Sequence, residues 1–157
     1  MDKTLFKKTE RLLKNYNQLV NEIEMIQNEI EITQSSYIGC GAIGYSEKSG
    51  TTNKFSSVVE SEILIRNEKL RKLESDLKYK KKLKNRIDMA IKNLSTQEEK
   101  DLINLRYINT PRSSWGNVAR HLRYNKDHCR KVLGPRTIRK MIDFIFYNPG
   151  VQERFDI

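Results

Sequence analysis

The sequence predicts an all-α protein: a long N-terminal coiled-coil helical hairpin followed by a C-terminal helix-turn-helix domain. Three observations lead to this fold class. Apolar residues recur every three and four positions near the N-terminus, a Gly/Ser/Thr-rich stretch follows, and short capped amphipathic segments occupy the last third of the chain. A chain of 157 residues can hold one moderate domain, or a small domain with an extended appendage. We place the long helices in residues 1–94 and the second domain in residues 95–157.

The first helix is predicted from a heptad spacing. Its apolar positions alternate steps of three and four residues, with Thr9 as the only interruption: Leu5, Leu12, Tyr16, Leu19, Ile23, Ile26 and Ile30. A 3.5-residue repeat held for nearly four heptads is typical of a coiled-coil seam. We therefore expect one helix over residues 3–34, roughly 48 Å long at 1.5 Å per residue.

A flexible loop is expected over residues 35–56, which hold four of the seven glycines and show no apolar periodicity. The string GCGAIG within it matches a dinucleotide-binding pattern, but a polar helix precedes it where that pattern needs a strand. We reject that interpretation.

A second long helix is expected over residues 57–94. Its apolar stripe has cationic seam positions at Lys80 and Lys84 and otherwise comprises Val59, Ile63, Leu70, Leu73, Leu77, Ile87, Ile91 and Leu94. Two helices of matched length suggest an antiparallel hairpin. A parallel coiled coil between chains is the alternative, because a lone two-helix hairpin buries little area. We expect homo-oligomerisation through these helices.

The net charge of +10 is unevenly distributed. Residues 1–36 and 37–62 each carry a net −1, whereas residues 63–94 carry +7 and residues 95–157 carry +5. Such a basic chain is expected to bind a polyanion. The densest run, KYKKKLKNR, fits a solvated helix face and phosphate contact equally well.

Enzyme chemistry is not expected. The two cysteines, Cys40 and Cys129, lie far apart, and neither His121 nor His128 has neighbours at metal-ligand spacing. No Ser/His/Asp set, paired-carboxylate site or phosphate-binding loop can be assembled, so we expect neither a cofactor nor a metal. With no long apolar run and no secretory signal, we expect a cytoplasmic protein.

The C-terminal domain begins with the capping box Ser95-Thr96-Gln97-Glu98, in which Ser95 caps the helix and Glu98 returns to its backbone. The helix buries Leu102, Ile103, Leu105 and Tyr107. It ends at Asn109-Thr110-Pro111, because proline disfavours helix at the preceding residue.

Two shorter helices complete the motif. Ser113 or Ser114 caps the first, whose apolar face is Trp115, Val118, Ala119 and Leu122, and a tight turn follows at Arg123-Tyr124-Asn125. Asn125 caps the second helix, with Cys129, Val132 and Leu133 inward and Lys126, His128, Arg130 and Lys131 outward. Two short helices joined by a three-residue turn, the second cationic outside, predict a helix-turn-helix.

This motif predicts double-stranded DNA as the partner. The second helix enters the major groove, and the N-terminus of the first binds phosphate through backbone N–H groups and hydroxyls. Base readers are expected at Lys126, His128, Arg130 and Lys131, and phosphate contacts at Arg112 and Arg136. The full candidate DNA-binding set is Arg112, Ser113, Ser114, Arg123, Asn125, Lys126, His128, Arg130, Lys131 and Arg136.

The stretches LSTQEEKDLINLRY, SWGNVARHL and RYNKDHCRKV resemble the helix-turn-helix of region four in bacterial sigma factors. The matching positions are Glu98, Leu102, Leu105, Arg106, Tyr107, Val118, Ala119, Leu122, Asn125, Cys129 and Val132. Two features depart from that pattern. Arg123 replaces the turn glycine, and Gly134-Pro135 is expected to interrupt the last helix, so that Ile138 to Met141 match one residue late.

Over residues 37–145 the chain also resembles the ArpU/RinA-type transcriptional regulators of Gram-positive phages and prophages, most clearly in SEKSGTTNKFSSVVESEI and the Lys-rich helix after it. This resemblance implies a DNA-binding regulator that activates late phage genes. Two alternatives stay open: a small terminase subunit for DNA packaging, and a sigma-like module that binds RNA polymerase without reading DNA.

Overall fold

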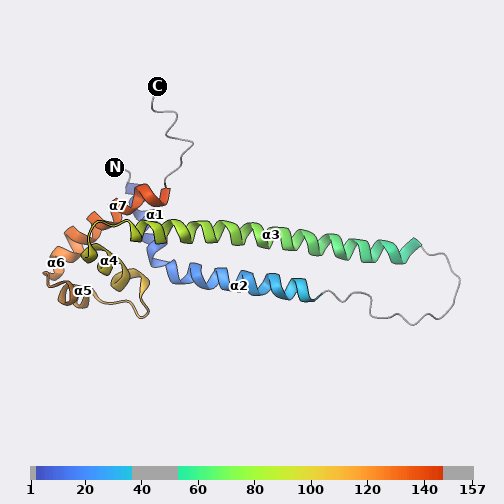
Figure 1. The fold of residues 1–157 in the computed structure, drawn as a ribbon, viewed down its shortest axis with the longest axis horizontal. Coiled ribbons are helices and arrows are strands. Elements are labelled where there is room, and N and C mark those ends of the chain that lie inside the picture. Colours follow the sequence, from blue (N-terminus) through green and yellow to red (C-terminus); the bar gives the residue numbers. More distant parts are fainter. Residues whose placement is uncertain (1–2, 37–52, 147–157) are drawn as a thin grey trace, which may run out of the picture. The chain divides into compact units, whose positions relative to one another are not determined.

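The computed structural model describes residues 3–36 and 53–146, and in this part of the chain every regular element is helical (Figure 1). The all-α fold class is therefore confirmed. The elements are α1 (Lys3–Lys14), α2 (Tyr16–Ser35), α3 (Asn53–Lys92), α4 (Gln97–Ile103), η1 (Asn104–Ile108), α5 (Trp115–Leu122), α6 (Lys126–His128), η2 (Cys129–Leu133) and α7 (Gly134–Phe146). The expected loop lies mostly outside the described residues, as do Cys40 and the glycine string.

The chain divides into two compact units. The hairpin unit is Glu22–Lys80, and the terminal unit combines Met1–Asn21 with Lys81–Ile157. This grouping differs from the division at residues 94 and 95 expected from the sequence. The reason is that α1 packs on α7 and η1, and that Arg86 near the end of α3 donates a hydrogen bond to the Ile145 carbonyl of α7 at 3.4 Å; Leu13 and Ile87 are completely buried.

The single helix expected over residues 3–34 is wrong, because the helix breaks at Asn15. In α1 the fully buried residues are Thr9 and Leu13, whereas the seam residue Leu12 is only half-buried. Packing against η1 and α7 thus rotates α1 away from the heptad register. Asparagine competes for backbone hydrogen bonds and disfavours helix, so Asn15 is a suitable point for the break.

In the hairpin unit, α2 and α3 run antiparallel and are joined by ion pairs. Lys69 Nζ lies 2.5 Å from Glu29 Oε1, and the seam cation Lys80 lies 2.7 Å from Glu22 Oε2. The expected seam residues Ile63, Leu70, Leu73 and Leu77 are half-buried at the predicted spacing, while the side chain of Val59 lies outside the description. In the structure of the single chain, α2 and α3 thus pair with each other, and pairing between chains stays a prediction. Helix α3 starts at Asn53 and ends at Lys92, a few residues N-terminal of its expected bounds at both ends.

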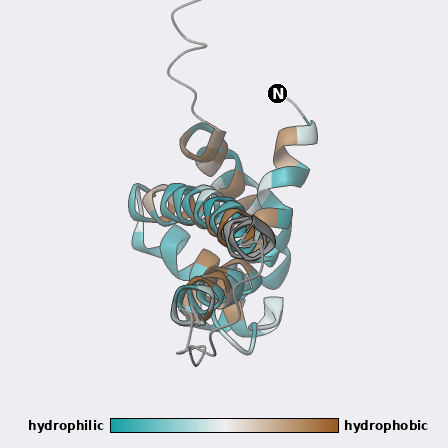
Figure 2. Ribbon diagram, turned by 90° about the vertical axis from the view of Figure 1, so that its right-hand side faces the viewer, coloured by the Kyte–Doolittle hydropathy of each residue, from teal (hydrophilic) through white to brown (hydrophobic). Residues whose placement is uncertain are grey.

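The core of the terminal unit is assembled from helices far apart in the sequence. Its fully buried side chains, each less than 2 % exposed, include Leu13, Ile87, Leu102, Ile103, Val118, Cys129, Thr137, Met141 and Ile145. Burying one aliphatic side chain of this size stabilises a fold by about 1.5–3 kcal/mol. Hydrophobic and hydrophilic residues share the same helices in Figure 2, as amphipathic packing requires. This core fixes α4, α5 and α7 around one another.

The helix cap expected at Ser95 lies one residue later. Thr96 is the N-cap of α4, and its Oγ1 accepts a hydrogen bond from the Glu99 backbone N–H at 3.3 Å. Glu98, expected to complete the capping box, instead accepts a hydrogen bond from the Tyr124 hydroxyl at 3.1 Å. The shift carries Glu99 into the core, where it is 3 % exposed and pairs with Lys140 at 2.5 Å. At the other end, η1 stops at Ile108 as predicted.

The expected interruption at Gly134-Pro135 is also wrong, since the helix continues from α6 through η2 into α7. Gly134 has helical angles (φ −57°, ψ −54°), and its N–H bonds to the Cys129 carbonyl five residues back. A π-helical turn of this kind inserts one extra residue into the helix. It also interrupts the regular α-helical hydrogen bonds, which proline would otherwise break. This extra residue coincides with the offset in the sequence, where Ile138 to Met141 match the sigma-factor pattern one residue late. Cys129 and Leu133 point inward as expected, but Val132 is 52 % exposed, which corrects its inward assignment.

Candidate nucleic-acid interface

Helix α5 begins at a side-chain cap. Ser114, with extended backbone angles, is the N-cap, and its Oγ accepts a hydrogen bond from the Asn117 N–H at 3.2 Å. Ser113 does not cap: its N–H donates to the Leu105 carbonyl and its carbonyl accepts from Arg106 Nη1. The Arg106 guanidinium in turn lies 5.1 Å from the Trp115 ring centroid. Val118 and Ala119 anchor the helix as predicted.

The turn after α5 depends on one residue in a left-handed conformation. Arg123 has φ 57° and ψ 35°, the C-cap geometry that glycine normally supplies. The Tyr124 N–H donates to the Ala119 carbonyl at 3.0 Å and closes the end of α5. Asn125 then caps α6 as predicted, with its Oδ1 accepting the Asp127 N–H at 2.8 Å. The three-residue turn therefore has the expected bounds.

The four expected base readers, Lys126, His128, Arg130 and Lys131, are all exposed. Lys126 and Arg130 have no ion-pair partner among the described residues, while Lys131 lies 3.7 Å from Asp127 with both side chains 69 % exposed. An ion pair so exposed is weak, because water screens it. These four cationic or titratable side chains are available to a partner from one short stretch of helix.

An aromatic contact orders one side of this surface. The rings of Tyr124 and His128 lie 5.3 Å apart, and the Tyr124 hydroxyl donates to Glu98. That hydrogen bond raises the pKa of Tyr124, with the negative charge of Glu98 adding to the effect. On the buried side, desolvation raises the pKa of the Cys129 thiol, which keeps it protonated and unreactive.

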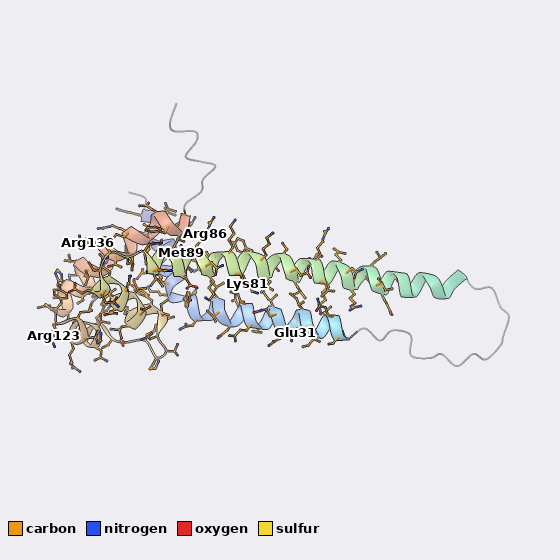
Figure 3. All side chains as sticks on the ribbon, in the orientation of Figure 1. Glu31, Lys81, Arg86, Met89, Arg123 and Arg136 are labelled. Atoms are coloured by element: carbon orange, nitrogen blue, oxygen red, sulfur yellow. The ribbon has the colours of Figure 1, made fainter. Side chains whose placement is uncertain are left out.

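The remaining candidates fall into two groups. Arg123 is exposed in the turn before α6 and Arg136 is exposed on α7, and Figure 3 labels both at this end of the terminal unit. Arg112 differs, because its guanidinium donates to the carbonyl of Lys14 at the C-terminus of α1. It stabilises that helix end, and its expected contact with a DNA phosphate stays a prediction.

Two residues of this surface were missed in the sequence. Asp127 was passed over among the cations around it, and Val132 was assigned inward before the π-helical turn was known. Both are exposed. Carboxylates accept hydrogen bonds from cytosine N4, and aliphatic side chains contact the thymine methyl. The surface thus presents donors, an acceptor and an apolar contact.

Metal sites and membrane-spanning helices are both absent from the described residues. No group of three or more His, Cys, Asp or Glu side chains there could hold a metal ion. Nor is any helix in that part of the chain long and apolar enough to cross a membrane.

The fold and this surface define an all-α protein in which a helical hairpin is joined to a unit bearing an exposed cationic helix. Over residues 5–142, most of its length, the chain matches the family described as "Protein of unknown function (DUF722)", and it belongs to that family. Comparison with curated proteins gave no match, and neither did comparison with solved structures.

Proposed function

We propose that the protein is a sequence-specific DNA-binding transcriptional regulator and that α5 and α6 act as its helix-turn-helix. The observation that supports this most is the row of exposed side chains on a capped helix directly after a three-residue turn. Such a helix can enter the major groove, where the residues near its N-terminus reach base edges. The cap at Asn125 sets the start of that helix.

The proposed roles follow from chemistry and position. Arg130 or Lys131 would donate to guanine O6 and N7, and Lys126 and His128 would reach neighbouring bases. The backbone N–H groups at the start of α5, beside Ser114, would bind a phosphate. Arg136 would add a phosphate contact that positions the protein without reading sequence.

The wider biology is part of the same proposal. The resemblance to ArpU/RinA-type regulators supports activation of late phage genes inside the bacterial host, without enzymatic activity or a cofactor. The long helices of the hairpin unit support homo-oligomerisation, because a single two-helix hairpin buries little area.

The test is binding of single alanine variants to an operator library. Lys126→Ala, His128→Ala, Arg130→Ala and Lys131→Ala are compared with Lys92→Ala, which removes an exposed cation at the end of α3. Loss of a base reader should cost about 1–3 kcal/mol at one operator position and relax the preference there. The Lys92 variant should leave every preference unchanged.

Three results would contradict the proposal. If none of the four variants changes a base preference, α6 does not read DNA. Assembly of eight or more chains in light scattering would favour a terminase ring. Absence of DNA binding at moderate salt would favour a module that binds only RNA polymerase.

A further inference from the structure

Helix α1 carries a concentrated positive charge that block averages of the sequence hide. It holds five cations and one carboxylate, Glu10, whereas α2 holds four glutamates and no cation. The positive charge of α1 and the negative charge of α2 therefore cancel in the net charge of residues 1–36. All five cations are exposed: Lys3, Lys7, Lys8, Arg11 and Lys14. Glu10 pairs only with Lys14, at 2.9 Å, so four cations have no acidic partner among the described residues.

The structure fixes α1 to the same unit as the proposed reading helix. Thr9 and Leu13 on its inner face are completely buried. Just after α1, the Asn17 side-chain amide donates to the Ile108 carbonyl and to Thr110 Oγ1, both at 2.8 Å. Arg112 adds its hydrogen bond to the last carbonyl of α1. The cations of α1 therefore have a defined place in the terminal unit.

A groove lies between α1 and η2, the helical turn that carries the proposed base reader Arg130. It has a volume of about 280 Å³, and Phe6 and Glu10 of α1 line it together with Trp115, Arg130 and Pro135. Because positions three and four apart share a helix face, Lys3, Lys7 and Lys14 lie next to the strip formed by Phe6 and Glu10. Lys3, Lys7 and Arg11 line a second hollow on α1, together with Thr4 and Lys8.

This placement suits one strand of a DNA duplex. The major groove is about 12 Å wide, so an element beside a helix in the groove faces the sugar–phosphate backbone at its edge. Lys3, Lys7 and Arg11 are spaced by four residues, about 6 Å along the helix axis, and form one row. A row of unpaired cations contacts phosphates without regard to base sequence.

We propose that α1 is a second DNA-contacting surface, which binds backbone phosphates beside the site read by α6 and η2. The inference rests on the proposed function and extends it: the DNA footprint includes the N-terminal helix as well as the helix-turn-helix. In this arrangement α1 supplies affinity, and the base readers supply specificity.

The experiment compares two triple variants with the same change in charge. The first is Lys3→Gln, Lys7→Gln and Arg11→Gln. The matched control is Arg71→Gln, Lys78→Gln and Lys82→Gln, which removes three exposed cations of α3 that have no ion-pair partner among the described residues. Binding constants of the full chain for operator DNA are measured from 50 to 200 mM salt.

The plot of log K against log salt has a negative slope, and the α1 triple variant should reduce the magnitude of that slope by about 2–3. Each phosphate contact contributes about 0.9 to it. The base preferences of this variant should stay those of the wild type, and the control should reduce the magnitude of the slope by less than about 1. Lys7→Gln alone, at an exposed site, should lower it by about 0.9 and covers the case in which the triple variant fails to fold.

Two outcomes would overturn the inference while leaving the proposed function intact. One is a wild-type slope in the α1 triple variant, which would point to a different partner for this surface, such as an acidic protein. The other is an equal loss in the control, which would mean that cations of α3 contribute as much to DNA binding as those of α1 and that α1 is not a distinct contact surface. A wild-type chain that does not bind DNA would instead contradict the proposed function itself.

Discussion

The buried ion pair between Glu99 and Lys140 ties α4 to α7, and its disruption gives a sharp stability test. Glu99 is 3 % exposed, and its Oε1 lies 2.5 Å from Lys140 Nζ. Its other oxygen, Oε2, accepts no hydrogen bond from any described residue. Lys140→Met keeps the aliphatic part of the side chain but leaves the carboxylate without its cation.

The expected cost follows from burial. Removing one partner of a buried ion pair costs about 3–5 kcal/mol, because the remaining charge stays desolvated. The Lys140 side chain is 33 % exposed, so water screens part of the interaction and the lower end of that range applies. We expect a loss of about 3 kcal/mol, equivalent to roughly 6–12 °C in melting temperature for a chain of this size.

Urea unfolding followed by the fluorescence of Trp115 provides the assay. This is the only tryptophan in the chain, and it lies in the terminal unit beside Gly134 of α7. Lys72→Met is the matched control, since Lys72 pairs with Glu68 at 2.9 Å with both side chains more than half exposed. That exposed pair should contribute less than about 0.5 kcal/mol.

A double variant separates pairing from packing. Glu99→Leu combined with Lys140→Met should recover most of the lost stability, because no unpaired charge then remains in the core. If Lys140→Met and Lys72→Met unfold at the same urea concentration, Glu99 is not held by Lys140 and the reasoning is refuted.

Three further predictions concern the same unit. Arg123→Gly should stabilise the protein by about 0.5–1 kcal/mol in urea unfolding, since glycine adopts φ 57° without steric cost; a loss would contradict this. Gly116→Ala should gain about 0.5–1 kcal/mol through helix propensity. Gly134→Ala should lose about 1 kcal/mol, because its Cβ would lie 3.0 Å from the Trp115 ring and 3.1 Å from a backbone carbonyl; equal effects would refute the packing argument. Burial, with a smaller contribution from the charge of Glu10, raises the pKa of Tyr107 from 10.0 to about 12. Stability should therefore fall by up to about 2 kcal/mol as pH rises from 10 through 12, and Tyr107→Phe should remove that loss in alkaline melting curves.

Apolar periodicity predicted most of the helical elements, because whether a segment forms a helix depends mainly on side chains that are close together in the sequence. The turn at Arg123–Asn125 and the caps at Ser114 and Asn125 could be predicted, since each depends on residues within four positions. The half-buried stripe of α3 followed from its heptads for the same reason.

The errors arose where tertiary packing overrides local pattern. Asn15 breaks a run with good heptad spacing because Thr9 and Leu13 pack on helices far along the chain. The exposure of Val132 depends on a π-helical turn, which no apolar spacing reveals. The cations of α1 escaped notice because charge was averaged over a block that also contained α2. Of these features, the break at Asn15 depends on packing partners that lie distant in sequence.

The discontinuous make-up of the terminal unit has a consequence for how the chain folds. Its first helix, α1, is synthesised long before α7, on which it packs, so the unit can close only after the last helix has formed. The hairpin needs only its own residues, and its ends meet where Glu22 pairs with Lys80. Forming it first would remove the loop-closure cost of roughly 60 residues, about 3.5 kcal/mol, from the later step. Formation of the hairpin would thus bring the two sequence segments of the terminal unit close together. Weakening the apolar seam between α2 and α3 should therefore slow folding of the terminal unit.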